Sequence, residues 1–117
     1  MDANKIYRLI DKLLEKTKDG TLRWEFTGTP DTFQVALPYS SIRVLKKKSS
    51  ENLIELYNEE GILIEQFPPI INNELFDYRP DTHQILASLF EMARRQALHV
   101  DQEIDKILNT LENGFHS

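Results

Sequence analysis

The chain has 117 residues, of which 40% are hydrophobic and 28% are charged, so we expect one folded globular domain rather than a disordered chain. It contains no cysteine, which excludes a disulfide framework and a cysteine-ligated zinc site. No apolar run approaches the ~18–20 residues of a membrane span. The first residues also lack the charged-then-apolar order of a signal peptide. We therefore expect a cytoplasmic protein, and we predict no cofactor.

The net charge of −5 is unevenly distributed along the chain. Residues 1–50 carry ten basic and six acidic side chains, whereas residues 51–81 carry one basic and eight acidic ones. A general nucleic-acid binder needs a net basic face. The acidic middle of the sequence therefore argues against that function.

Residues 3–18 show the 3.6-residue periodicity of an amphipathic helix. Its apolar stripe consists of Ile6, Leu9, Ile10, Leu13 and Leu14, and charged side chains fall largely outside the stripe. Gly20 can adopt the left-handed conformation that ends a helix. We expect this helix to cover one face of a sheet.

From residue 21 onward the apolar residues alternate, which predicts strands. The expected strands are residues 21–26, 32–37, 42–45, 53–57 and 62–67. Because short turns separate them, we expect a five-stranded antiparallel meander. The last two strands are apolar on both faces, which indicates a cover on each side. One cover would be a helix, and the other would be the following connector or another subunit.

The connector, residues 68–79, is unusually apolar for a loop. It contains Ile70, Ile71, Leu75, Phe76 and Tyr78 among prolines and asparagines. Large apolar residues are rarely left in water without a reason. The connector either packs onto the sheet as part of the core or contacts a partner or ligand as a flap.

The last third of the sequence carries an unbroken heptad, which we call the apolar seam. The seam consists of Leu86, Phe90, Ala93, Ala97, Val100, Ile104, Ile107 and Leu111. One helix from Asp81 to Glu112 would be ~48 Å long, whereas a small domain is only ~30 Å across. The helix is either continuous or broken near residue 100, where Asp101 could begin a second helix. Part of the seam would then need helix one or a second chain to cover it, with small Ala93 and Ala97 allowing close approach.

Signatures of catalysis are absent from the sequence. Four glycines are too scattered to form a phosphate-binding loop, and no nucleophile elbow is present. His99 and Glu103 stand one helical turn apart, but two ligands do not make a metal site. We therefore predict no metal and no catalytic residue, and an enzyme of unknown class is our third alternative.

A basic loop provides the alternative to protein binding. Lys46, Lys47 and Lys48 follow a predicted strand, with Arg43 and Tyr39 nearby in sequence. Such a loop beside an aromatic ring can contact phosphates and stack a base. A loop that contains several lysines is more often a solvent-exposed turn than a nucleic-acid contact.

Two segments resemble small uncharacterised bacterial proteins. In these proteins a helix runs through Lys-Thr-x-x-Gly into a strand that carries a Trp, as Lys16-Thr17 to Gly20 and Trp24 do here. Residues 89–97 with Val100, Asp101 and Ile104 resemble their closing helix. The resemblance implies a bacterial source and brings no activity.

We conclude that the chain has an α+β fold, with an N-terminal helix, a five-stranded antiparallel meander and a long C-terminal helix on the sheet. The predicted function is a protein-binding or assembly module, acting as an accessory, inhibitory, immunity-like or chaperone-like protein and forming a homodimer. The predicted partner-binding residues are Ile70, Ile71, Phe76, Tyr78, Ala93, Ala97, Val100 and Ile104. A nucleic-acid-contacting accessory factor that uses Arg43 and Lys46 to Lys48 is the alternative.

Overall fold

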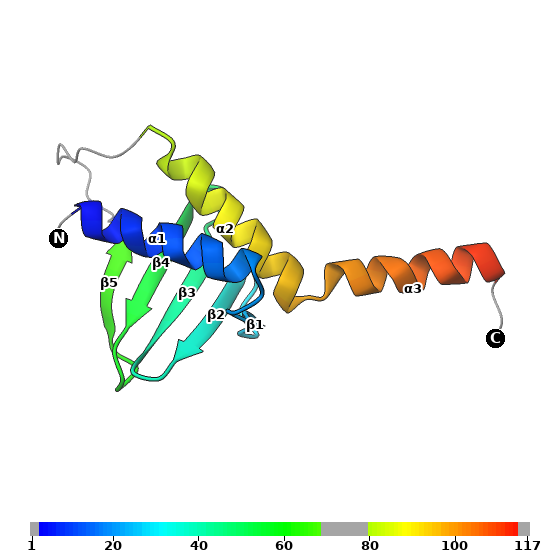
Figure 1. Cartoon of the computed structure of the whole chain (residues 1–117), viewed down its shortest axis with the longest axis horizontal. Coiled ribbons are helices and arrows are strands. Elements are labelled where there is room, and N and C mark those ends of the chain that lie inside the picture. The colour runs from blue at the N-terminus through cyan, green and yellow to red at the C-terminus, as the bar shows by residue number, and fades with distance from the viewer. Residues whose placement is uncertain (1–2, 69–79, 115–117) are drawn as a thin grey trace.

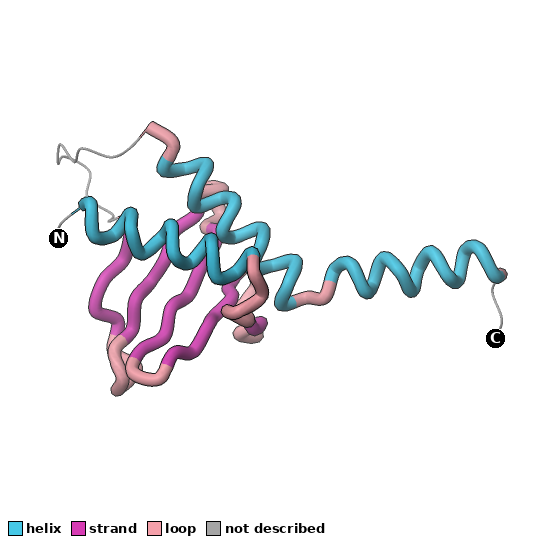
Figure 2. Tube along the Cα trace, viewed as in Figure 1, coloured by secondary structure: helices cyan, strands magenta, loops and turns pink. Residues whose placement is uncertain are grey.

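The computed structural model describes residues 3–68 and 80–114 of the chain. The elements are α1 (Ala3–Lys18), β1 (Glu25–Phe26), β2 (Thr32–Leu37), β3 (Ser40–Lys46), β4 (Asn52–Tyr57), β5 (Leu63–Phe67), α2 (Thr82–Ala97) and α3 (Val100–Asn113). Figures 1 and 2 show α1 and α2 against the sheet, and α3 extending away from both. In these two ranges no helix combines the length and the apolar character that crossing a membrane requires.

The five strands form one antiparallel sheet in the order β1-β2-β3-β4-β5, so the predicted α+β meander is confirmed. The strand predicted over residues 32–37 has the same bounds as β2. β3 is longer than predicted because its pairing with β4 extends from Ser41 to Lys46. The connector and its candidate binding residues lie outside the described residues.

The core lies between the sheet and the two helices that cover it. One register row across β2 to β5 is entirely apolar and buried, and it consists of Phe33, Val44, Ile54 and Phe67. Ile10 of α1 and Leu86 and Leu89 of α2 pack into the same cluster. The Tyr7 ring meets the Phe67 ring edge-on, with centroids 5.6 Å apart. Both helices therefore lie on one face of the sheet.

The first predicted strand is much shorter than expected. The sequence pattern predicts a strand over residues 21–26, but only Glu25 and Phe26 pair with β2. The backbone of residues 22–24 instead bonds to the Gln96 side chain of α2. Trp24 is nevertheless buried, and its indole N–H donates to the Thr17 hydroxyl at 2.8 Å.

Apolar side chains at the start of β5 are exposed in the part of the chain that the structure describes. Ile62, Leu63 and Ile64 are each about half exposed, at 58%, 46% and 59%. On the face of the sheet away from the helices, Arg43 donates to Gln34 and stacks on the Tyr57 ring. Leu53 of β4 is buried on that face, and the predicted second cover, the connector or another subunit, lies outside the described residues.

The C-terminal seam is divided between two helices. α2 ends at Ala97, and His99 adopts a left-handed conformation with φ 53° and ψ 46° before α3 begins. Of the two arrangements that the sequence allows, the structure has the broken one. Of these two C-terminal helices, only α2 lies against the sheet, since α3 contacts no described element except α2.

Replacing Trp24 with Ala should lower the free energy of unfolding by ~3–5 kcal/mol, because it removes a large buried ring. Trp24→Phe keeps an aromatic ring but leaves the Thr17 hydroxyl without its donor, so it should cost ~1–3 kcal/mol. Urea denaturation followed by circular dichroism measures both. Trp24 is the single Trp of the sequence, and a water-exposed indole emission in the folded protein would contradict this packing.

Candidate functional site

The α3 helix lies outside the body that α1, α2 and the sheet form. Every side chain from Asp101 to Asn113 is exposed, and Val100 is half-buried. The molecule measures 58 × 31 × 25 Å, and Figure 1 shows that α3 accounts for the long dimension. A helix of 14 residues is only marginally stable in water by itself. The body therefore contributes little to the stability of α3, which contacts only α2 among the described elements.

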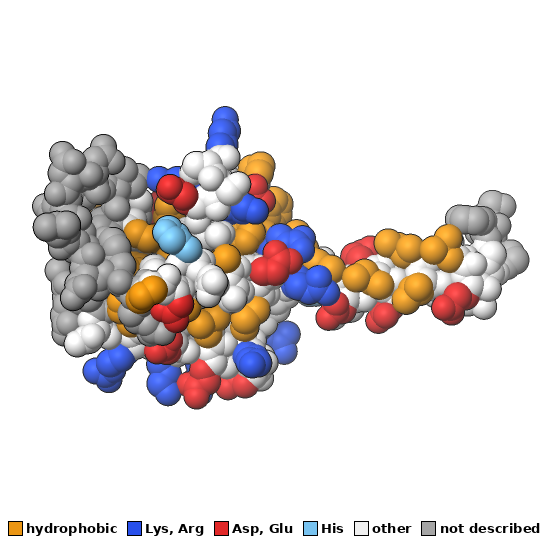
Figure 3. Space-filling model, turned by 90° about the horizontal axis from the view of Figure 1, so that it is seen from above, with side chains coloured by type: hydrophobic (Ala, Val, Ile, Leu, Met, Phe, Trp, Pro, Cys, Tyr) orange, Lys and Arg blue, Asp and Glu red, His pale blue; other side chains and the backbone are white. Residues whose placement is uncertain are grey.

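One side of α3 is apolar along its whole length. We define the α3 stripe as Ile104, Ile107, Leu108 and Leu111, which are 43%, 57%, 47% and 61% exposed. Their i, i+3, i+4 and i+7 spacing places them on one face of the helix. Figure 3 shows hydrophobic side chains gathered along α3, with acidic ones beside them. This is the arrangement of anchors with which an amphipathic helix binds an apolar surface.

Acidic side chains border the α3 stripe. α3 carries four acids and one base, a formal net charge of −3. Lys106 pairs with Glu103 at 3.0 Å, and Arg95 of α2 pairs with Asp101 at 2.6 Å. Asp105 and Glu112 have no ion pair among the described residues. At ~100° per residue, Asp101, Asp105 and Glu112 fall on the same border of the stripe.

Gln96 determines where the body ends. Its side-chain Oε1 accepts a hydrogen bond from the Trp24 backbone N–H at 2.6 Å, and its Nε2 donates to the Leu22 carbonyl at 2.9 Å. These two bonds attach the last turn of α2 to the segment between α1 and β1. The helix then ends at once, since Leu98 caps α2 and His99 turns the chain.

The described residues predicted to bind a partner do not form one surface. Ala93 is fully buried and Ala97 is half-buried, and both pack against the chain's own core. Val100 and Ile104 belong to α3, and Ile104 is part of the α3 stripe. The prediction omitted Ile107, Leu108 and Leu111 from the binding residues. The heptad already contained Ile107 and Leu111. The sequence pattern did not show at which residue the buried core ends.

The residues of the nucleic-acid alternative are divided between two ends of β3. Lys46 and Lys48 are exposed at the β3–β4 turn, whereas Tyr39 is 76% exposed at the β2–β3 turn. Arg43 lies between them on the polar face of the sheet, held by Gln34 and Tyr57. The structure therefore does not place Tyr39 beside the basic loop.

Two shifted pKa values accompany these polar contacts, and neither indicates an acid–base site. Burial and a hydrogen bond to Glu55 raise the pKa of Tyr57, which keeps its hydroxyl neutral. The hydrogen bond from Arg94 lowers the pKa of Glu91 on the surface of α2. Residues 3–68 and 80–114 contain no cluster of three or more metal-ligating side chains.

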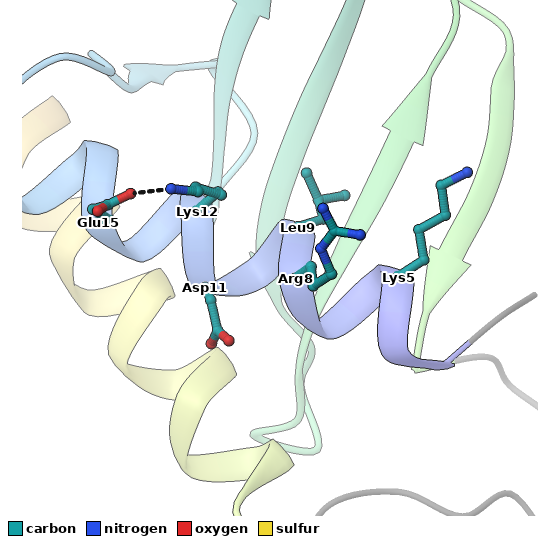
Figure 4. A pocket seen from close by; sticks show the side chains of 6 residues that line it. All are labelled: Lys5, Arg8, Leu9, Asp11, Lys12 and Glu15. Atoms are coloured by element: carbon teal, nitrogen blue, oxygen red, sulfur yellow. Dashed lines mark hydrogen bonds and ion pairs between the residues drawn. The ribbon is translucent and has the colours of Figure 1, made fainter.

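A shallow depression runs along the exposed side of α1. Its lining consists of Lys5, Arg8, Leu9, Asp11, Lys12 and Glu15. Figure 4 shows Leu9, Lys5 and Lys12 pointing to the side of α1 on which the strands extend past the helix, and Asp11 pointing toward α2. Lys12 pairs with Glu15 at 3.0 Å, whereas Lys5 and Arg8 make no ion pair in the described part of the chain.

No family model, no curated protein and no solved structure matches this chain.

Replacing Gln96 with Ala should destabilise the body, because the Trp24 N–H and the Leu22 carbonyl both lose a partner in a partly buried position. We expect a loss of ~1–3 kcal/mol in the free energy of unfolding, measured by urea denaturation. Gln96→Glu can still accept from Trp24, but at neutral pH its carboxylate faces the Leu22 carbonyl oxygen in a partly buried position, so it should also be less stable than the wild type. Equal stability of all three proteins would show that Gln96 does not attach α2.

Proposed function

We propose that this protein is a small assembly module that binds protein through α3, and that a second copy of the chain occupies the α3 stripe. The exposure of the stripe carries this proposal. Four large aliphatic side chains are exposed to water on one side of α3, and no described element of the chain covers them. Contiguous exposed apolar surface of this kind marks interaction sites. The cytoplasmic location expected from the sequence is part of the same proposal.

The size of the α3 stripe indicates a reversible association. Burying the exposed half of an Ile or Leu side chain contributes on the order of 1 kcal/mol. Standard stable interfaces bury ~1,200–2,000 Å² in total, which one stripe does not supply alone. Association also costs several kcal/mol of lost translational and rotational freedom. The dimer should therefore dissociate on dilution.

Ile107→Asp tests the proposal, because it places a charge in the middle of the stripe without touching the core. At high concentration the wild type should have twice the chain mass of 13.7 kDa in sedimentation and light scattering, whereas Ile107→Asp should remain a monomer. The matched control is Asn109→Asp, which adds the same charge on the opposite side of α3 and should dimerise as the wild type does.

Circular dichroism and thermal unfolding of the three proteins show whether the body is intact. We expect the same melting of the body for both variants at low concentration, where all three proteins are monomeric. A wild type that is monomeric at every concentration would contradict the proposal. So would an Ile107→Asp protein that dimerises as well as the wild type.

A further inference from the structure

The two helices at the ends of the chain carry opposite charge. α1 has five basic and two acidic side chains, a formal net charge of +3, whereas α3 has a net charge of −3. They also have similar lengths, with 16 and 14 residues. Complementary charge of this kind guides association and disfavours wrong pairings. The surface of α1 is therefore a suitable counterpart for α3.

The depression along α1 combines positive charge with an apolar floor. Leu9 is half-buried, and Lys5 and Lys12 lie beside it at positions i−4 and i+3. The methylene stems of lysine and arginine can cover apolar side chains while their charged ends stay in water. Lys5 and Arg8, which have no ion pair among the described residues, would face acids such as Asp105 and Glu112.

Apolar sheet surface continues beyond α1. Leu37 at the end of β2 lies on the helix-covered face and is 36% exposed, and Leu56 of β4 on the same face is half-buried. Figure 1 shows strands β2 to β5 continuing past α1 toward their turns. A third helix on this face could contact Leu9 of α1 and the uncovered end of the sheet together.

We propose that α3 of one copy lies along α1 of a second copy, in the depression around Leu9, and that the two copies make this contact reciprocally. The inference rests on the proposed self-association and names the surface that accepts the α3 stripe. In each copy α3 extends away from its own body, so it does not reach its own α1 (Figure 1). A two-fold axis would make both contacts identical and double the buried area.

Pairing of two α3 helices with each other is the main competing arrangement, and the charges disfavour it. Each helix has a net charge of −3, so direct pairing would place like charges together. Pairing of α3 with α1 brings together net charges of opposite sign. The reciprocal contact also uses two stripes against two depressions, which brings the interface closer to the size of a stable one.

A charge exchange tests the arrangement. Lys5→Glu/Arg8→Glu changes the net charge of α1 from +3 to −1, and Asp105→Lys/Glu112→Lys changes that of α3 from −3 to +1. Each variant alone has like charges at both contacts, so its dimer should be at least tenfold weaker than the wild-type dimer. Mixed together, the two variants have opposite charges at both contacts and should form a heterodimer of near wild-type affinity. Lys47→Glu/Lys48→Glu is the matched control, since it makes the same charge change on the β3–β4 turn.

Sedimentation at low and at high salt measures how strongly each protein and the mixture dimerise. Circular dichroism confirms folding, which should persist because all four replaced side chains are exposed. Dimerisation of the α1 variant at wild-type affinity would overturn the inference and leave the proposed function intact, provided that Ile107→Asp is monomeric. Failure of the mixture to form a heterodimer would also overturn it. A wild type that is monomeric throughout would overturn both proposals.

Discussion

The position of α2 on the body depends on two hydrogen bonds between the Gln96 side chain and the backbone of Leu22 and Trp24. They attach the last turn of α2 to the chain just after α1, on the edge of the core that Trp24 fills. A buried or half-buried backbone group without a partner is costly, so this attachment resists any shift of α2 along the sheet. The point at which the body ends is thereby fixed.

The division of the apolar seam follows from that attachment. Leu86, Phe90 and Ala93 lie over the sheet and are buried, whereas Ile104, Ile107 and Leu111 lie beyond its edge and are exposed. The same heptad therefore has two physical roles. Its first half stabilises the body, and its second half presents apolar surface whose cover we assign to another copy of the chain. The Arg95–Asp101 ion pair spans the break between the two halves.

Local sequence patterns were sufficient for most of the fold. The amphipathic period predicted α1, and the alternation of residues predicted the meander. Patterns failed where a contact joins residues far apart in the chain. The shortening of β1 and the end of α2 both depend on Gln96, which meets residues 22 and 24 across more than 70 positions.

The candidate site shows the same limit. The seam indicated that an apolar stripe exists, but not that Ala93 would be buried by the chain's own core while Ile107 remains in water. Nothing near residue 99 is a Gly or a Pro, so the left-handed turn at His99 has no strong local signal. The opposite charges of α1 and α3 can be counted in the sequence. Their relevance appears only when both helices are seen to have exposed, uncovered sides.

Hydrogen exchange of the α3 backbone amides at several protein concentrations tests the central claim most directly. If a second copy covers the α3 stripe, these amides should be protected at high concentration and should lose protection on dilution, while the amides of the buried strands stay protected throughout. The α1 amides should change little, because their hydrogen bonds already belong to the body. Protection of α3 that is the same at all concentrations would contradict the account.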